Sequence, residues 1–279
     1  MSRQALAAAC LAALTILAVS AGTAGAKHCG DLVDGGRVAC DCGDIVVSDT
    51  RLQPGDPIVG RRCPLEGLIV AAPLLADSIT LDLNGLTLRG ERYGAGIRVE
   101  SGGASGTVIR GAGNGRGHAE IVGFSAGITT PRFGTVARVE GVEVKGARGD
   151  GLVLRGRGIV LIDVTSSHNG GDGVRVDGYG GRLVRVQAFA NNGNGLSLFA
   201  AGVLVDGVAE HNRKHGIVVR APRATLQSVR ARFNKGVGIV APRAVVGKGG
   251  GAAAAVESIV SDGNGRRDVR YTGRAERIP

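Results

Sequence analysis

The 279-residue chain lacks tryptophan and contains only five phenylalanines, three tyrosines, one methionine and eight prolines. So few prolines exclude a collagen-like or proline-rich chain. The scarcity of large side chains beside 49 glycines argues against a helical bundle, because glycine destabilises helix interiors and serves turns. Hydrophobic residues nevertheless make up 43% of the chain. The composition therefore predicts a folded protein whose core consists mainly of Val, Ile, Leu and Ala.

Residues 1–26 have the pattern of an export signal. Arg3 supplies a positive charge, Ala5–Val19 is apolar, and Ala24–Ala26 is a small-residue cleavage site. The apolar run is shorter than the roughly 20 residues that a membrane-spanning helix needs, which favours export over an uncleaved anchor. We therefore expect a mature chain of 253 residues without a transmembrane segment, located in the periplasm, outside the cell or on its surface.

The cysteines are concentrated at the start of this mature chain. Cleavage would remove Cys10 and leave four cysteines, and an even number in an exported chain predicts two disulfides. The three possible pairings remain open at this stage. A zinc site is the alternative, but the spacing of Cys40 and Cys42 does not suit a zinc ribbon, and we predict no metal site. We expect residues 27–65 to form an N-terminal cap, stapled by Cys29, Cys40, Cys42 and Cys63.

A repeat of about 22 residues organises the rest of the chain. Glycine–apolar pairs recur at spacings of 22, 22, 21 and 22, at Gly151-Leu152, Gly173-Val174, Gly195-Leu196, Gly216-Ile217 and Gly238-Ile239. A fixed period of this size is typical of repeat architectures. Five residues before the apolar member stands an asparagine, at Asn169, Asn191, Asn212, Asn234 and, before Val269, Asn264. We predict that these amides form a ladder of hydrogen bonds between neighbouring turns.

Within each repeat, apolar residues alternate as they do in strands. Val174–Asp177 and Leu183–Val186 are examples, and no segment has a sustained 3.6-residue pattern. A small residue stands three positions before each asparagine, at Ser166, Ala188, Ala209, Ala231 and Ser261. Such a column indicates tight packing inside a narrow coil. The pattern therefore predicts a parallel β-helix, whose coils stack about 4.8 Å apart.

Several segments resemble a known superfamily. Ile79–Gly90 resembles the first-coil signature of secreted right-handed parallel β-helix proteins, the pectate-lyase-like superfamily. Cys29–Asp31 and Cys63-Pro64 resemble the cysteine-bearing start of one bacterial branch, whose repeats the Asn…Gly-Asp-Gly-Val units resemble. The resemblance covers about residues 29–272. It implies an all-β fold: one right-handed parallel β-helix of nine or ten coils over residues 66–272, followed by a tail, 273–279. Because the superfamily includes lyases, polygalacturonase-like enzymes, epimerases and adhesins, the resemblance implies no single activity.

Strand alternation predicts a polar strip on one lateral face. The first and third residues after each repeat glycine should point inward, and the second and fourth outward. The first outward column contains Val153, Arg175, Ser197 and Val218. The second contains Arg155, Asp177, Phe199 and Arg220. A turn column beside them contains Asp150, Asp172, Asn194 and His215.

This strip supports two hypotheses. Resemblance to lyases implies carboxylates that hold Ca²⁺ and an Arg or Lys that removes a proton. No catalytic residue of the family is carried over, but the strip offers Asp150, Asp172 and Asp177 as candidate calcium ligands and Arg175 or Arg155 as the candidate base. The competing interpretation is structural, because Asp-Gly is ordinary turn chemistry and mixed-charge strand faces are usually solvated. We expect the structural interpretation to hold, so that a catalytic residue stays unknown and Ca²⁺ is expected only under the lyase hypothesis.

The charge of the chain indicates its partners. The net charge of +10 falls to +9 when Arg3 is removed with the signal. A basic exported protein favours acidic polysaccharides or other anionic cell-surface polymers. Too few aromatic residues are present for specific nucleic-acid recognition by stacking. We predict a non-enzymatic carbohydrate-binding or surface-structural protein, with a calcium-dependent lyase or epimerase as the alternative. Candidate ligand contacts are Asn194, His215, Phe199 and Arg220.

Overall fold

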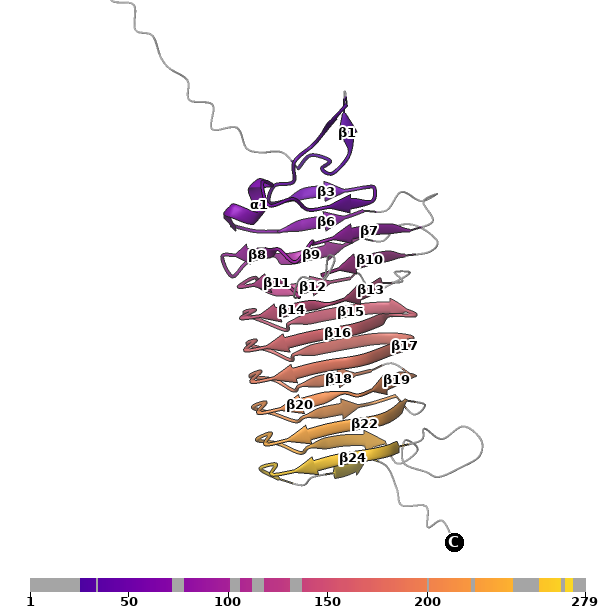
Figure 1. Cartoon of the computed structure of the whole chain (residues 1–279). Coiled ribbons are helices and arrows are strands. Elements are labelled where there is room, and N and C mark those ends of the chain that lie inside the picture. The colour runs from indigo at the N-terminus through magenta and orange to yellow at the C-terminus, as the bar shows by residue number, and fades with distance from the viewer. Residues whose placement is uncertain are drawn as a thin grey trace, which may run out of the picture.

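The computed structural model describes residues 26–33, 35–71, 78–100, 106–111, 118–130, 137–199, 201–221, 224–242, 256–266 and 269–272. The predicted signal up to residue 25 and the predicted tail, 273–279, lie outside these residues. The described chain is a stack of strands with one short helix, α1 (Pro57–Gly60), near its N-terminal end (Figure 1). None of its helices is long and apolar enough to cross a membrane.

The strands lie in three columns that run the length of the stack. The first column contains β3 (Asp44–Val46), β6 (Leu68–Val70), β9 (Ala95–Val99), β12 (Ala126–Thr129), β15 (Leu152–Arg157), the start of β17 (Val174–Phe189), β18 (Leu196–Leu198), β21 (Ile217–Val219), β23 (Ile239–Pro242) and β25 (Val269–Thr272). The second contains β4 (Thr50–Arg51), β7 (Ile79–Asp82), β10 (Thr107–Arg110), β13 (Ala137–Glu140), the start of β16 (Val160–Ser167), the middle of β17, β19 (Ala201–Val205), and the starts of β22 (Thr225–Arg232) and β24 (Val256–Asp262). The third contains β5 (Arg62–Cys63), β8 (Thr87–Gly90), β11 (Ala119–Val122), β14 (Val142–Lys145), the ends of β16 and β17, β20 (Val208–Glu210), and the ends of β22 and β24.

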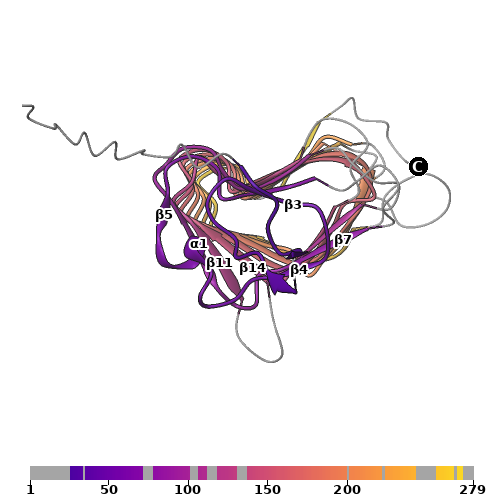
Figure 2. The ribbon, with the colours of Figure 1, turned by 90° about the horizontal axis from the view of Figure 1, so that it is seen from above.

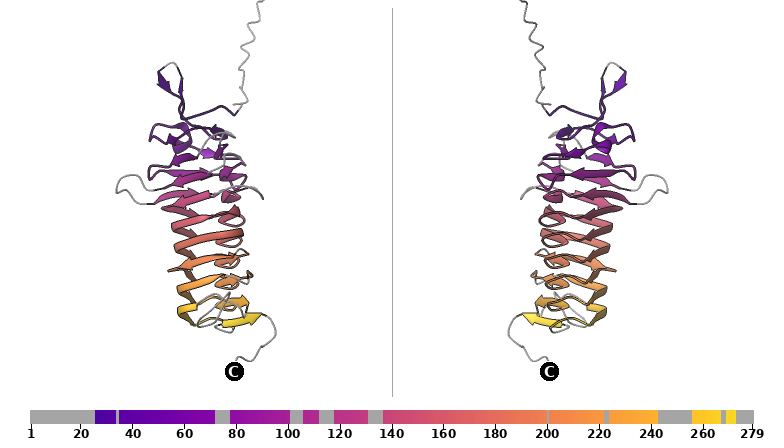
Figure 3. Two further views of the ribbon diagram at one scale, coloured as in Figure 1. Left: turned by 90° about the vertical axis from the view of Figure 1, so that its right-hand side faces the viewer. Right: turned by 90° about the vertical axis from the view of Figure 1, so that its left-hand side faces the viewer.

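Each strand pairs in parallel with the equivalent strand of the next coil. Leu152, Val174, Leu196 and Ile217, for example, lie in register across four coils. Seen from above, the coils superpose on one another (Figure 2), and the side views show their strands stacked along one axis (Figure 3). The chain is therefore the predicted right-handed parallel β-helix, the hand that parallel crossovers almost always take. Within the described residues, nine coils are followed by β25.

Aliphatic side chains fill the interior of the coils. The residues predicted to point inward from the first column are all buried, at Leu152, Leu154, Val174, Val176, Leu196, Leu198, Ile217 and Val219. One phenylalanine, Phe124, is buried among them. Burying aliphatic surface contributes about 25 cal/mol per Å², so this continuous core is the main source of stability. The composition-based expectation of a Val, Ile, Leu and Ala core is confirmed.

The repeat asparagines form a buried ladder along the axis. Asn169 Nδ2 donates to Asn191 Oδ1 at 2.9 Å, Asn191 Nδ2 to Asn212 Oδ1 at 3.0 Å, and Asn212 Nδ2 to Asn234 Oδ1 at 2.9 Å. Each Oδ1 also accepts the backbone N–H of the preceding asparagine. The same bonds continue from Asn234 to Asn264, although these two residues are 30 apart in sequence. The amides thus satisfy backbone groups that the bend would leave unpaired in the core.

The glycines and small residues of the repeat make room for this ladder. A Cβ on Gly173 would lie 2.6 Å from Asn191 Nδ2 and 3.0 Å from Ala188 Cβ. A Cβ on Gly195 would meet Asn212 Nδ2 at 2.7 Å and Ala209 Cβ at 2.8 Å. Separations this short are steric clashes. The glycine, the small residue and the asparagine of each repeat therefore form one packing unit.

Two bends per coil use left-handed backbone at residues other than glycine. The bend between the second and third columns has φ values of 51° to 53° at Asp163, Arg185, Asp206 and Ser228. The bend that precedes the asparagines has φ values of 54° to 58° at His168, Ala190, His211 and Phe233. This conformation costs about 1–2 kcal/mol for a residue with a Cβ. Its recurrence in successive coils shows that stacking imposes it.

The N-terminal end of the stack is covered by a small cap. Its hairpin pairs β1 (Leu32–Val33) with β2 (Gly36–Arg37), and His28 forms a parallel bridge to Ile45 of β3. Arg37 is hydrogen-bonded through both terminal nitrogens to the buried carboxylate of Asp56, each at 2.7 Å. Strands β3 to β5 pair with β6 to β8, so the coils extend into the segment 27–65 that we predicted to be the cap.

Two disulfides, as predicted, hold this end together. Cys29 pairs with Cys40 and Cys42 with Cys63, which selects one of the three pairings that the sequence leaves open. Cys63 lies in β5, so the second bridge joins the cap to the first coil. Bridges that close loops of this length stabilise a fold by about 3 kcal/mol each, mainly by restricting the unfolded chain.

We predict that Asn191→Ala destabilises the protein by about 2–4 kcal/mol, because it removes the side-chain acceptor of the buried Asn169 N–H and the donor to the Ser166 carbonyl. The measurement is the free energy of unfolding in urea. Asn192→Ala is the matched control, because Asn192 is the exposed neighbour of Asn191 and should change stability by less than about 0.5 kcal/mol. Equal effects of the two substitutions would contradict a stabilising role for the ladder.

Candidate functional site

The predicted polar strip lies on the outer face of the first column. Arg175, Ser197 and Val218 are in register on successive coils, and Arg155 is in register with Asp177. Phe199 and Arg220 directly follow β18 and β21 in the same column. The structure therefore brings the sequence candidates together on one face, between β15 and β21.

The turn residues at the edge of this face form a second ladder. The backbone N–H of Asp172 donates to Asp150 Oδ1 at 2.7 Å, and that of Asn194 to Asp172 Oδ1 at 2.7 Å. The N–H of His215 donates to Asn194 Oδ1 at 3.1 Å, and that of Val237 to His215 Nδ1 at 2.8 Å. Each side chain thus accepts the backbone N–H of the next coil. These four candidate residues have a structural task, which the turn chemistry of the sequence suggested.

Asp172 is held most firmly of the four. Its second oxygen, Oδ2, accepts the hydroxyl of Ser197 at 2.7 Å and lies 3.5 Å from Asn194 Nδ2. Both oxygens of the carboxylate are therefore engaged within the protein. Ionised carboxylates in such sites act as acceptors that orient their neighbours rather than as free ligands.

Two residues expected to be exposed on this face are buried. The exposed fraction of Ser197 is 0% and that of Val218 is 5%. The predicted register is nevertheless correct, since Ser197 pairs with Arg175 and Val218 on the outward column. The Ser197 hydroxyl is enclosed in polar contacts, since it donates to Asp172 Oδ2 at 2.7 Å and accepts from Asn194 Nδ2 at 3.1 Å. Alternation gives the direction of a side chain, whereas its neighbours decide its exposure.

A phenylalanine lies between two arginines at the far end of the face. The guanidinium carbon of Arg175 is 4.8 Å from the centroid of the Phe199 ring, and that of Arg220 is 5.0 Å from it. Arg175 and Arg155 also lie 3.2 and 3.5 Å from Asp177 Oδ2. Cation–π contacts of this geometry contribute about 0.5–1 kcal/mol at exposed sites. The ring therefore orients two cations and does not offer a free face for stacking.

Arg220 is the cation of this group that is open to a ligand. It is exposed, and among the described residues no carboxylate lies within 4.0 Å of it. Beside it is a hollow of about 300 Å³, lined by His215, Val218, Val219, Arg220 and Val240. This volume is at the lower end of the range for small-molecule sites. The hollow joins two candidate ligand residues, His215 and Arg220, from opposite ends of β21.

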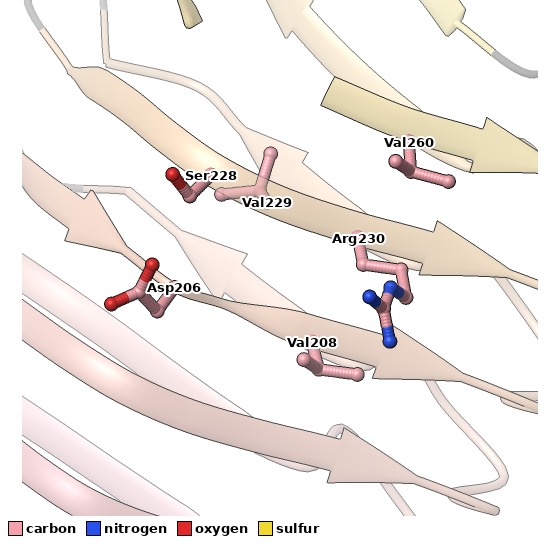
Figure 4. A pocket seen from close by; sticks show the side chains of 6 residues that line it. All are labelled: Asp206, Val208, Ser228, Val229, Arg230 and Val260. Atoms are coloured by element: carbon pink, nitrogen blue, oxygen red, sulfur yellow. The ribbon is translucent and has the colours of Figure 1, made fainter. Parts of the chain in front are cut away.

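A second hollow lies at the bend between the second and third columns, where sequence analysis placed no candidate. It measures about 330 Å³ and is lined by Asp206, Val208, Ser228, Val229, Arg230 and Val260 (Figure 4). Asp206 and Ser228 occupy the left-handed bend position, one coil apart. Their recurrence at the repeat period is the signal that would have located them. Its lining thus includes the carboxylate of Asp206, the guanidinium of Arg230 and three valines.

The carboxylates of the face do not fit a calcium site. Calcium takes six to eight oxygen ligands, usually from several carboxylates and carbonyls. Asp172 has both oxygens engaged and Asp177 faces two arginines. In the described part of the chain, no group of three or more His, Cys, Asp or Glu residues is arranged to hold a metal ion. No step of a lyase mechanism is therefore derived from these residues.

Comparisons with known proteins agree with the fold. Residues 126–244 match the family model described as "Right handed beta helix region". No curated protein sequence matches the chain. Among solved structures, the A-modules of the mannuronan C-5 epimerases AlgE4 and AlgE6 of Azotobacter vinelandii are similar, at 16% and 17% identity and TM-scores of 0.48 and 0.47. Each alignment covers 81% of this chain and 64% or 63% of the epimerase module, so the chain spans a little under two thirds of these structures.

A tailspike protein is a weaker match. The Dettilon tailspike protein (gp208) aligns at 13% identity with a TM-score of 0.31, over 78% of this chain and 62% of its own.

The turn ladder generates a prediction about pH. Burial raises the pKa of Asp150, and the charge of Asp172 raises it further, while the hydrogen bond from the Asp172 N–H and the charges of Arg175 and Arg155 oppose the shift. Between the ordinary pKa and the raised one, the folded chain binds a proton that the unfolded chain has lost. Stability therefore falls as the pH rises through this window.

Asp150→Asn keeps an acceptor for the Asp172 N–H but removes the charge. We expect its free energy of unfolding at pH 7 to be equal to or higher than that of the wild type. The two should converge below about pH 3, where aspartates are protonated. Asp163→Asn is the control of opposite sign, because the hydrogen bond from Arg185 lowers the pKa of Asp163 and stabilises the fold at neutral pH. Urea unfolding at several pH values tests both, and a loss of stability in Asp150→Asn at pH 7 would contradict the assignment.

Proposed function

We propose that this right-handed parallel β-helix protein is an exported binding or surface-structural protein that engages anionic glycans without transforming them. The observation that carries the proposal is Arg220, an exposed guanidinium oriented by Phe199 beside a hollow of about 300 Å³. The two disulfides support an oxidising compartment, in which such bonds persist. Periplasm, extracellular space and cell surface all meet this condition.

The charge of the face supports an acidic ligand. Guanidinium groups bind carboxylates and sulfates through paired hydrogen bonds with matched geometry. Because Phe199 holds Arg220 from one side, part of the entropy of ordering this long side chain is lost before the ligand arrives. The net charge of the mature chain, +9, attracts polyanions over longer distances. The hollow has room for one sugar unit next to the guanidinium.

The arrangement favours binding over the alternative of a calcium-dependent lyase or epimerase. That alternative requires Asp150, Asp172 and Asp177 to act as metal ligands. Asp150 and Asp172 accept backbone N–H groups of the next coil, and Asp177 faces Arg155 and Arg175. Recruiting them would break contacts between coils and between charges. Binding by Arg220 requires no such rearrangement.

Retention of the mature chain on immobilised polygalacturonate and alginate, with neutral dextran as reference, tests the proposal. We expect retention on the acidic polymers that weakens steeply with salt, because exposed charge pairs are screened. Arg220→Ala and Phe199→Ala should each weaken binding about three- to tenfold, which corresponds to about 0.7–1.4 kcal/mol. Arg182→Ala removes an exposed arginine from another column and is the matched control.

The same incubations reveal catalysis. Unsaturated or shortened products that depend on added calcium would overturn the non-enzymatic proposal. Absence of retention on every acidic polymer at low salt would overturn the glycan-binding proposal itself. If Arg220→Ala binds the acidic polymers as tightly as the wild type while Arg182→Ala binds them more weakly, the assignment of the site to Arg220 is overturned.

A further inference from the structure

Four exposed cations stand on one turn of the last coils. They lie between the third and first columns, one or two residues after the ladder asparagines, at Arg213, Lys214, Lys235 and Arg266. Backbone hydrogen bonds place them in two adjacent rows. In the first row, the N–H of Arg213 donates to Asn191 O, and in the next coil the N–H of Lys235 donates to Asn212 O. The second row contains Lys214, Gly236 and Arg266 from successive coils. We call these four residues the basic ridge.

The ridge has no acidic counterpart in the described part of the chain. No carboxylate lies within 4.0 Å of any of the four side chains, whereas some other surface arginines are paired. Arg185 binds Asp163, and Arg232 binds Asp262. Unpaired cations in successive coils repel one another, so their proximity costs stability unless an anion lies across them. Such a row therefore points to an anionic partner.

The fold itself does not require these cations. The equivalent positions of the two preceding coils are Gly170-Gly171 and Asn192-Gly193. A Cβ on Gly171 or Gly193 would crowd the carboxylate of Asp150 or Asp172, which explains glycine there. The later coils keep the same turn with one or two cations at these positions, as Arg213-Lys214, Lys235-Gly236 and Gly265-Arg266. The ridge is thus an addition to a turn that folds without charge.

The geometry of the ridge selects a linear ligand. Coils of parallel strands are spaced by about 4.8 Å, so the cations form a narrow band along the axis over three coils. Arg213 and Lys235 are neighbours in one row, and Lys214 and Arg266 flank Gly236 in the other. An extended polyuronate has one carboxylate per sugar unit, so its charges also follow one another along a line. Phe233, 46% exposed and two residues before Lys235, adds an apolar border beside the row.

Nucleic acid fits this row less well. The phosphates of each duplex strand rise by about 3.4 Å along the helix axis per nucleotide and wind away from a straight line. Single-stranded nucleic acid is bound through open aromatic faces. The Phe233 ring is packed against His211, at 5.2 Å between centroids, and over Gly263. Arg232 covers it further, at 4.9 Å.

We propose that the basic ridge binds an extended acidic polysaccharide that lies parallel to the axis of the β-helix. This inference rests on the proposed glycan binding, for which it assigns a second site and the direction of the polymer. Arg220 lies at the opposite end of β21 from Lys214, so the two sites are separable by mutation.

A turn-exchange variant tests the ridge. Arg213→Asn, Lys214→Gly and Lys235→Asn together give both turns the Asn-Asn-Gly sequence of residues 191–193, which already folds in this position. The matched control removes three exposed arginines elsewhere, by Arg62→Gln, Arg157→Gln and Arg182→Gln. Affinity for alginate, polygalacturonate and a DNA duplex is measured at several salt concentrations, and urea unfolding verifies that each variant is folded. The single variants Arg213→Gln and Lys235→Gln replace the exchange if it unfolds.

We expect the exchange to weaken polysaccharide binding at least tenfold and to reduce its salt dependence, while the control weakens it less than threefold. Equal losses in exchange and control would overturn the ridge and leave the Arg220 proposal standing. If the wild type is retained on neither polysaccharide, both proposals are overturned. Tighter wild-type binding to DNA that the exchange abolishes would make the ridge a nucleic-acid site and overturn the polysaccharide assignment.

Discussion

The buried amide ladder constrains almost every other feature of this β-helix. Each amide bonds to the asparagine of the next coil, so the coils must keep one spacing and one register at this corner. The glycine of each repeat is a consequence of the ladder, because a Cβ at this position would collide with the amide and with the small residue opposite. An insertion is tolerated only where it leaves the corner intact. The bond from Asn234 to Asn264 survives a 30-residue separation because the extra residues fall between β23 and β24.

The outside of the coils shows how the same stacking distributes charge. Equivalent outward positions come together from residues about 22 apart in sequence, so opposite charges at one position form pairs such as Arg185 with Asp163. The turn column uses its carboxylates differently, since Asp150 and Asp172 accept backbone donors of the following coil. The carboxylates of Asp150 and Asp172 are engaged in these structural hydrogen bonds. Among the described residues, no carboxylate pairs with Arg220 or with the basic ridge. Cations without a carboxylate partner thus remain on the described surface, among them Arg220 and the basic ridge.

Much of this structure follows from the repeat, and the remainder depends on local packing. The period located the asparagines, the inward Leu and Val residues, and the register of Arg175 with Ser197, because all are set by position within the coil. The disulfide pairing did not follow, since spacing permits three arrangements. The burial of Ser197 and Val218 depends on which neighbours reach over them, which alternation does not encode. The basic ridge was missed because it lies on the turn, where a strand pattern assigns no direction.

The cap gives the stack two unequal ends. In the described part of the chain, both disulfides and the Arg37–Asp56 pair lie at the first coil, whereas β25 is bonded only to β23 on one side. In a solenoid, each coil is stabilised by its neighbours, so a coil with one neighbour opens most readily. The described coils are therefore cross-linked most strongly at the first coil. The basic ridge and the hollow beside Arg220 lie toward β25, so a ligand that bridges several of those coils would hold them together as the disulfides do at the first coil.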